Sequence, residues 1–190
     1  MRRDMRESRR TQYTRRMLED GLIDLMKTTP YDKITVTALC AHTDITRSTF
    51  YMHYEDIYAL LCSMEEDVLA WERQVIADLS GKWTEGQEAM LQSLERLFAY
   101  FVENSKYLQV LMSERGDIYF QKRFFEAAYR ICNLSGVRSK TKGPLAEDPR
   151  FIFVVNGGVG LTQYWLKNGL KESPRAIAEI IYDMALPIRK

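Results

Sequence analysis

The sequence predicts an all-α protein of about nine helices, with an N-terminal three-helix domain followed by a larger helical domain. Apolar residues recur with the period of a helix along almost the whole chain, and no stretch alternates as a strand would. The five prolines lie between the periodic segments or at their ends. With 46% hydrophobic residues over 190 positions, the chain can bury a core without cross-links.

The N-terminal third is predicted to hold one long helix and two short ones. The first covers about residues 8–28 and ends before Pro30, because the residue preceding a proline avoids helical backbone. Two helices of about two turns follow at 36–43 and 47–53, joined by a tight turn at Asp44, a residue type that tolerates left-handed backbone. Helices this short are unstable alone, so we expect all three to pack on one another.

Six more helices are expected in the rest of the chain, each bounded by a capping residue, a glycine or a proline. We place them at about 56–79, from 84, at 107–112, 117–136 and 149–169, and from 174. The long helix at 56–79 carries one continuous apolar face over about six turns. We therefore expect one domain at residues 1–55 and a second at 56–190.

Charge is distributed unevenly along the chain. The formal net charge is only +1, but seven arginines fall within residues 1–16 against two acids, Asp4 and Glu7. A basic end on a neutral protein is typical of an arm that binds a polyanion, and a solvated terminus has the same composition.

Cysteine usage and hydropathy favour the cytoplasm. Cys40, Cys62 and Cys132 are odd in number, far apart and within apolar helical stretches, which disfavours a disulfide framework or a metal site. No apolar signal segment opens the chain, and the longest apolar run, 151–155, is too short to span a bilayer. We expect a cytoplasmic protein with no metal, no cofactor and no membrane partner.

The second short helix has an uncommonly polar surface. Five of six consecutive side chains carry hydrogen-bonding groups: Thr46, Arg47, Ser48, Thr49 and Tyr51. A helix fits the major groove of DNA, where arginine binds guanine through two hydrogen bonds and hydroxyls reach phosphates or base edges. Thr35 caps the preceding helix, whose free N–H groups suit a phosphate. The pattern indicates a helix-turn-helix DNA-binding domain.

Three short motifs narrow this interpretation: ITV at 34–36, ITRSTFYMHY at 45–54 and the leucine pair at 60–61. Together they resemble the DNA-binding domain of the TetR family of bacterial regulators over about residues 10–62. The resemblance implies a homodimer without enzymatic activity that binds a double-stranded DNA operator and responds to a small-molecule effector, most simply as a repressor.

The resemblance also implies roles for individual residues. Operator contacts are expected from Thr46, Arg47, Ser48, Thr49, Tyr51, His53 and Tyr54, and a phosphate contact at Thr35. Two positions depart from the family pattern, because Asp44 replaces a usual glycine and Ile57 replaces a lysine that contacts phosphate. Lys33 or the arginine-rich end is expected to supply the missing contact.

The segment FIFVVNGGVGLTQYWLKNG at 151–169, followed by Ser173 and Pro174, resembles one C-terminal subgroup of the family, which includes regulators related to activators of dihydroxyacetone utilisation. A glycine within a helix lowers its stability by roughly 1 kcal/mol relative to alanine, so Gly157, Gly158 and Gly160 indicate close approach of another helix. In this family the last two helices pair between subunits. We expect the dimer interface, a helical dimerisation surface, at Gly157, Gly160, Leu161, Trp165, Ile177, Ile181 and Met184.

The effector pocket is expected among the aromatic residues of the second domain, although a core role is the simpler interpretation of any single one. The expected ligand-binding residues are Trp71, Phe98, Phe101, Phe125, Tyr129, Asn156 and Tyr164.

Two other functions compete with DNA reading. The stretch Glu55, Asp56 and Ile57 also fits a dimeric ligand-binding protein that has lost DNA binding. An all-helical enzyme is the third possibility, but the sequence holds no glycine-rich phosphate loop and no nucleophile motif. His42 and His53 have no partner at metal or acid–base spacing.

Overall fold

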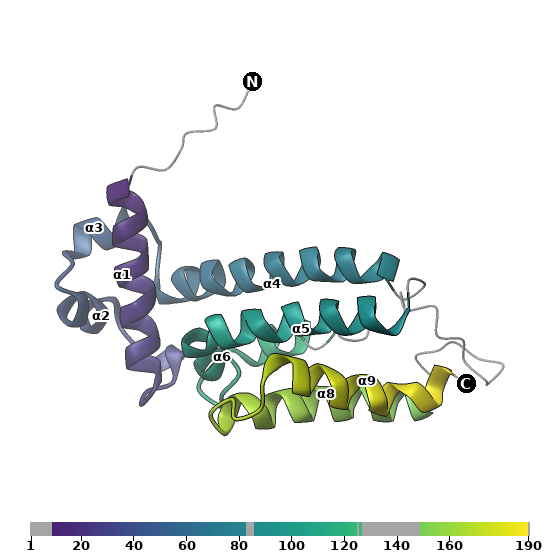
Figure 1. Cartoon of the computed structure of the whole chain (residues 1–190). Helices are drawn as coiled ribbons and strands as arrows, with labels where there is room; N and C mark the ends of the chain where they lie inside the picture. Colours follow the sequence, from purple (N-terminus) through teal and green to yellow (C-terminus); the bar gives the residue numbers. More distant parts are fainter. Residues whose placement is uncertain (1–8, 83–85, 125, 127–148, 190) are drawn as a thin grey trace.

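The computed structural model describes residues 9–82, 86–124, 126 and 149–189, and every regular element within these ranges is a helix (Figure 1). The elements are α1 (Arg9–Met26), the 3-10 turn η1 (Tyr31–Lys33), α2 (Val36–Thr43), α3 (Arg47–Tyr51), α4 (Ile57–Lys82), α5 (Gln87–Glu103), α6 (Ser105–Leu111), a helical segment at 118–124, α8 (Pro149–Lys167) and α9 (Pro174–Arg189). The predicted all-α fold is confirmed.

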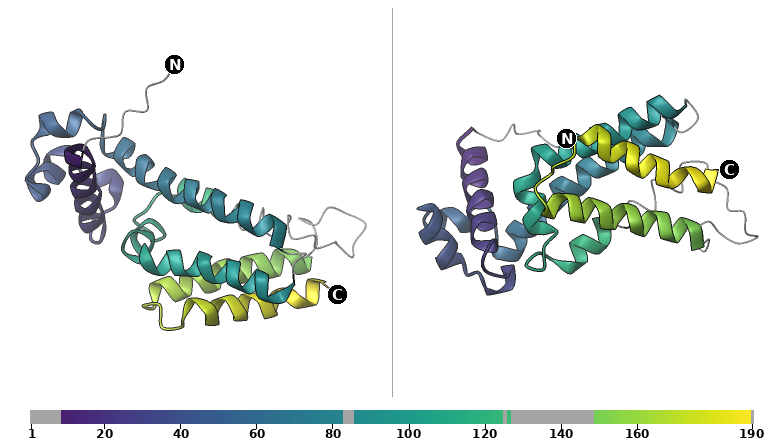
Figure 2. Two further views of the ribbon diagram at one scale, coloured as in Figure 1. Left: turned by 45° about the horizontal axis from the view of Figure 1, so that its top comes forward. Right: turned by 60° about the horizontal axis from the view of Figure 1, so that its bottom comes forward.

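The helices form two groups, which we call the head and the body. The head consists of α1, η1, α2 and α3, which gather at one end of the molecule (Figures 1 and 2). The body begins with α4, which extends away from the head beside α5, and α8 and α9 lie along the other side of α5. Contacts of α1 with α4 and α6 join the two groups.

Apolar side chains of all three head helices meet in one small core. Leu18 and Leu22 of α1, Leu39 of α2 and Phe50 of α3 are fully buried there. The two-turn helices are therefore held by burial of single large side chains, as their short length requires. The backbone of α1 also approaches α2 closely at Gly21, where a Cβ atom would overlap Cγ2 of Thr43.

Replacing Gly21 by alanine is expected to destabilise the protein by about 1–3 kcal/mol. Thr43 cannot turn away easily, because it is β-branched, buried and donates a hydrogen bond to the Leu39 carbonyl at 2.9 Å. The steric cost outweighs the higher helix propensity of alanine, which is about 1 kcal/mol. Urea denaturation of Gly21→Ala measures the loss.

Gly158→Ala is the matched control for this substitution. Gly158 lies inside α8, and the nearest atom to its added Cβ is Cγ2 of Ile181 at an ordinary 4.0 Å. This variant is expected to be as stable as the wild type or slightly more stable. Equal stability of Gly21→Ala and Gly158→Ala would show that α1 and α2 are not in close contact.

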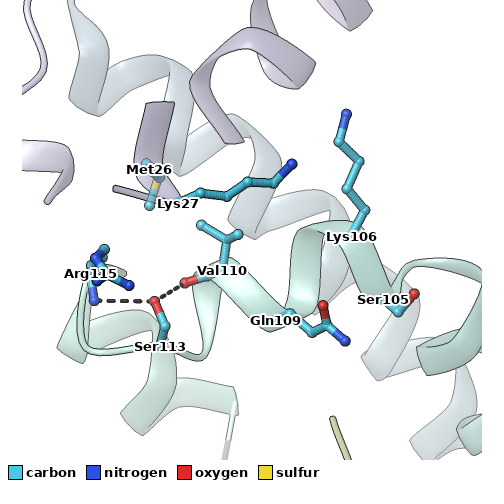
Figure 3. A pocket seen from close by; sticks show the side chains of 8 residues that line it. All are labelled: Met26, Lys27, Ser105, Lys106, Gln109, Val110, Ser113 and Arg115. Carbon is cyan, nitrogen blue, oxygen red and sulfur yellow. Dashed lines mark hydrogen bonds between the residues drawn. The ribbon is translucent and has the colours of Figure 1, made fainter. Parts of the chain in front are cut away.

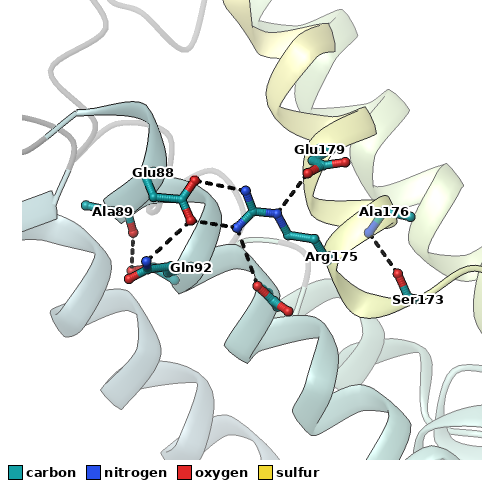
Figure 4. Close-up of polar contacts among 9 residues, drawn as sticks. Glu88, Ala89, Gln92, Ser173, Arg175, Ala176 and Glu179 are labelled. Atoms are coloured by element: carbon teal, nitrogen blue, oxygen red, sulfur yellow. Dashed lines mark hydrogen bonds and ion pairs between the residues drawn. The ribbon is translucent and has the colours of Figure 1, made fainter.

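The body core is rich in aromatic rings, and an ion pair joins α5 and α9 at its surface. Phe98 and Trp165 meet edge to face with ring centroids 5.7 Å apart, and the Trp165 indole donates to the Glu172 carbonyl at 3.0 Å. At the surface, Arg175 of α9 donates to both carboxylate oxygens of Glu88 on α5, at 3.0 and 2.9 Å (Figure 4). This exposed bidentate pair fixes the register of α9 on α5 more than it adds stability.

Two carboxyl groups are buried where the body meets the head. Glu65 of α4 is 0% exposed and Asp117, just before the segment 118–124, is 1% exposed. One oxygen of each, Oε1 of Glu65 and Oδ2 of Asp117, has no hydrogen-bond partner within the described part of the chain. Burial and, to a smaller extent, the nearby Asp117 carboxyl raise the pKa of Glu65, and the Arg123 guanidinium at 3.2 Å opposes the shift, so that the resulting pKa is about 7.

Most predicted helix boundaries lie within a few residues of the observed ones. The start of α9 is confirmed in detail, since the Ser173 hydroxyl accepts from the Ala176 N–H at 3.2 Å. The capping box predicted at 84–87 is only partly described, and Gly86 at the start of α5 makes no side-chain cap. The predicted helix 117–136 is described at 118–124. Among the described helices, none has the length and hydropathy needed to cross a bilayer.

Candidate nucleic-acid interface

Local hydrogen bonds build the turn between α2 and α3 as the sequence predicts. The hydroxyl oxygen of Thr35 accepts from the Ala38 N–H at 3.1 Å, and that of Thr46 accepts from the Thr49 N–H at 3.2 Å. Asp44 ends α2 with a φ of 54°, a left-handed conformation that glycine adopts more readily and aspartate tolerates. Both threonine caps and the Asp44 turn are thus confirmed.

The helix α3 divides sharply into a buried face and an exposed face. Phe50 fills the head core, whereas Thr46, Arg47, Ser48 and half-exposed Tyr51 face outward. The hydroxyl of Thr46 lies 3.0 Å from that of Ser48 and 2.9 Å from that of Thr49, forming a small cluster at the helix start. Within the described ranges the Arg47 guanidinium has no hydrogen-bond or ion-pair partner. The exposed side chains therefore keep donors and acceptors for an external surface.

Tyr54 differs from its predicted role as an exposed phosphate contact. It is only 8% exposed, and its hydroxyl accepts from Nε of Arg15 at 3.1 Å. Arg15 also donates to the Ser63 hydroxyl of α4 at 3.1 Å, so one guanidinium ties α1 to the end of α3 and to the body. Sequence reasoning counted Arg15 only in the basic end; the helical spacing of Arg15 to the buried Leu18 and Leu22 was the signal that it faces inward.

The other predicted phosphate contacts belong to the head and differ in exposure. Thr35 and Lys33 are exposed, and Lys33 is 3.2 Å from the Asp32 carboxylate. His53 is partly buried, with its ring 6.3 Å from that of Tyr54. Arg9, Arg10 and Arg16 of α1 are exposed, and Arg15 is partly buried. The other arginines of the basic end, Arg2, Arg3 and Arg6, lie outside the described ranges.

The acidic stretch after α3 has a structural explanation. The Asp56 carboxylate accepts from the Ala59 N–H at 2.7 Å and so caps α4. Ile57 is buried under the head, which explains an apolar residue at this position. Of the three residues that favoured a lost DNA-binding function, only Glu55 is left exposed without a described role.

None of the pockets formed by described residues alone is lined by a residue predicted for the effector pocket. Phe98 and Phe101 belong to the packed core, and Trp71 stacks on Tyr100 with ring centroids 3.5 Å apart. Tyr164, at 65% exposure, and Asn156 lie on the outer side of α8. Two further candidates, Phe125 and Tyr129, lie outside the residues whose side chains are described.

The predicted interface residues divide between core and surface. Trp165 and Ile177 are buried within the protomer, so they support α8 and α9 from inside rather than face a partner. Leu161 and Ile181 are partly buried. Met184 is exposed, and no atom lies within 4 Å of a Cβ built on Gly157 or Gly160. The outer face of α8 is therefore open at both glycines.

Comparison with known proteins agrees with this geometry. The fold resembles a TetR transcriptional regulator from Streptococcus agalactiae 2603V (23% identity, TM-score 0.61, covering 93% of this chain and 95% of the other). It also resembles the dihydroxyacetone kinase operon activator DhaS (17% identity, TM-score 0.55, covering 92% and 94%). No curated protein sequence matches the chain. Residues 88–186 match the transcriptional regulator C-terminal region of TetR type, and the chain belongs to the TetR family of non-enzymatic transcriptional regulators.

Proposed function

We propose that this regulator binds a double-stranded DNA operator by inserting α3 into the major groove. The observation that carries the proposal is the division of α3 into a fully buried Phe50 and an exposed face led by Arg47. Arg47 has the donors to bind guanine through two hydrogen bonds, and Ser48, Thr49 and Tyr51 extend the same face. Base recognition requires a helix that is held firmly in the protein, here by Phe50, and exposed side chains whose donors are free to bind base edges.

Phosphate contacts on either side of α3 complete the proposed interface. The exposed N-terminus of α2 at Thr35 offers backbone N–H groups to one phosphate. Lys33 and His53 are proposed as further phosphate contacts, and the arginines that open α1 add charge. We leave Tyr54 out of this interface, because its side chain is only 8% exposed. Residues 1–55 are thus proposed as the DNA-binding domain and 56–190 as the regulatory and dimerisation domain.

A binding experiment on the full chain tests this proposal. The wild type is expected to retard DNA that flanks its gene in a mobility shift, with an affinity that falls steeply as salt rises. Tyr51→Ala, which removes an exposed side chain and leaves Phe50 in place, is expected to weaken binding about tenfold. Binding that Tyr51→Ala leaves unchanged would remove α3 from the contact surface.

We propose that the protein is a homodimer joined through the outer faces of α8 and α9. Phe153, Gly157, Gly160 and Tyr164 are spaced at helical intervals along one face of α8, and this face is open in the protomer. Two large apolar side chains of α9, Ile180 and Met184, are also exposed. An apolar face with glycines at its centre suits close packing against the same face of a second chain.

Introducing a charge on this face is expected to convert the dimer to monomers. Phe153→Glu places a carboxylate where a 73% exposed phenyl ring now lies, and a buried unpaired charge at the interface costs several kcal/mol. Sedimentation velocity measures the change. Tyr119→Glu is the matched control, since Tyr119 is 72% exposed on the segment 118–124, and it is expected to remain dimeric. Equal behaviour of the two variants would contradict this interface.

Effector control is proposed to act through α4. This helix begins at Ile57, soon after α3 ends at Tyr51, so a tilt of α4 changes the distance between the two α3 helices of a dimer. Operator binding needs that distance near one DNA turn, about 34–36 Å, or a small multiple. A small ligand that prefers one tilt therefore shifts operator affinity by its difference in affinity for the two states.

Repression is the proposed direction of regulation, with activation as the second candidate. Activation is favoured by one observation, the structural similarity to a protein that is by name an operon activator. Deleting the gene distinguishes the two in a promoter reporter: higher expression in the deletion strain supports repression, and lower expression supports activation.

A further inference from the structure

A pocket of about 530 Å³ lies at the joint between the head and the body (Figure 3). It is open to solvent and is bordered by the C-terminal end of α1, by α6 and by the turn that follows α6. Its lining residues are Met26, Lys27, Ser105, Lys106, Gln109, Val110, Ser113 and Arg115. Its volume is within the range of small-molecule sites, and none of the predicted effector-pocket residues lines it.

The lining of this joint pocket is basic. It contains three cations, Lys27, Lys106 and Arg115, and no acidic residue. Figure 3 shows the two lysines on one side and Arg115 on the other, with Val110 between them. The neutral polar groups are Ser105, Gln109 and Ser113. The Ser105 hydroxyl and the second N–H of the Gln109 amide can donate to an anion, whereas the Ser113 hydroxyl already donates to the Val110 carbonyl at 2.7 Å and the first Gln109 N–H to the Leu166 carbonyl at 2.9 Å. Such a set is selective for negative charge.

Hydrogen bonds outside the pocket hold the lysines in place. Nζ of Lys106 lies 2.7 Å from Oδ1 of Asp20, and Nζ of Lys27 lies 2.7 Å from Oδ1 of Asp24. Burial alone would raise the pKa of Asp20, but hydrogen bonds from Lys106 and Tyr107 outweigh it, so its pKa is below the ordinary value. Each ammonium has three N–H donors, so these contacts position the lysines without exhausting them.

Arg115 is the cation of the pocket that no carboxylate balances. Its guanidinium makes no hydrogen bond or ion pair to any residue in the described ranges. The turn that carries it is nevertheless fixed, because the Gln121 amide donates to the carbonyls of Leu111 at 3.1 Å and Ser113 at 2.7 Å. The Tyr31 N–H of η1 contacts the Arg115 carbonyl at 3.4 Å. An exposed arginine that has no carboxylate partner and stands on a fixed turn beside two positioned lysines is suited to bind an anion.

We propose that the joint pocket binds a small polyanion whose phosphate or carboxylate groups contact Arg115 from one side and Lys27 and Lys106 from the other. Figure 3 shows the two lysines and Arg115 on opposite sides of the pocket, so a ligand with a negative group at each end can contact both sides at once. Asp20 and Asp24 partly offset the charge of the lysines, which leaves Arg115 as the main positive charge. Because the lining comes from both head and body, the bound anion links the two groups. This site goes beyond operator reading and does not depend on it.

Calorimetric titration of the full chain with pyrophosphate and, separately, with citrate tests the proposal. Both titrations are done in a phosphate-free buffer at constant ionic strength. The wild type is expected to bind at one saturable site per chain. Binding of pyrophosphate alone identifies a phosphate ligand, and binding of both probes identifies the shared anion chemistry. If neither pyrophosphate nor citrate shows saturable binding, the proposal is overturned.

Two variants locate the site, and one serves as a control. Arg115→Gln on the body side and Lys27→Gln on the head side are each expected to weaken binding about tenfold. Arg96→Gln, an exposed arginine of α5 outside this pocket, is expected to bind as the wild type does. Binding that survives in Arg115→Gln, or that falls equally in Arg96→Gln, would show that the pocket is not the site. Operator affinity should be unchanged in Arg115→Gln, since a loss as large as that of an α3 variant would place this face on DNA instead.

Discussion

Replacing Arg47 by alanine is expected to reduce operator affinity by about thirtyfold or more. A bidentate contact from arginine to guanine is worth about 1–3 kcal/mol, and a symmetric dimer loses it twice, for a total of about 2–6 kcal/mol. The fold should be unaffected, because Arg47 is exposed and Phe50 still anchors α3 in the head core. Fluorescence anisotropy with a labelled operator at fixed salt measures the loss.

The competing explanation, a general loss of positive charge, predicts a different pattern. A phosphate contact would weaken all DNA sequences alike and lower the slope of log affinity against log salt. A base contact instead relaxes discrimination at one base pair of each half-site. Arg96→Ala removes the same charge from the body and should leave affinity within about twofold. An Arg47→Ala protein that still prefers its operator as strongly as the wild type would exclude a base-reading role.

Replacing Glu65 by glutamine is expected to stabilise the protein at pH 8 by about 1–3 kcal/mol. The carboxyl is fully buried, and its folded-state pKa of about 7 lies above the ordinary value of 4.5. Between these two values the folded state retains a proton that the unfolded state has released, so stability falls as pH rises and levels off above about 7. The difference corresponds to roughly 3 kcal/mol. Glutamine has a similar shape and no charge to desolvate.

The stabilisation by Glu65→Gln should therefore depend on pH. Near pH 5 the wild-type carboxyl is largely protonated in the folded state, and the two proteins should unfold at nearly the same urea concentration. Loss of the contact with Arg123 costs little, because that guanidinium is about half exposed. Glu66→Gln, at the adjacent exposed position, should change stability by less than about 1 kcal/mol at either pH. A Glu65→Gln protein that is less stable than the wild type at pH 8 would mean that the charged carboxylate is needed.

Features that depend on neighbouring residues in the chain were predictable from the sequence. The caps at Thr35, Thr46 and Ser173 and the left-handed Asp44 each involve a hydrogen bond or a backbone angle within a few residues, so a local pattern determines them. The buried Phe50 followed from the same reasoning, because a two-turn helix needs an apolar anchor.

Features set by tertiary packing were not predictable. The helix α8 is apolar on most sides, so periodicity alone did not reveal that Trp165 faces the core while Tyr164 faces outward. Arg15 contacts Tyr54 across 39 positions of sequence, and no local pattern indicates such a bond. The joint pocket arises where α1 meets α6, which again requires knowing which helices are neighbours.

Because α3 has one buried face and one exposed face, its stability and its DNA preference can evolve separately. Phe50 and the Thr46 hydroxyl carry the stability of the helix, whereas Arg47, Ser48 and Tyr51 contribute to contacts outside the chain. Mutations at the second set can alter the preferred DNA sequence without first passing through an unfolded variant. New specificities are therefore accessible by single steps, and a library randomised at these three positions should yield mostly folded proteins with different targets.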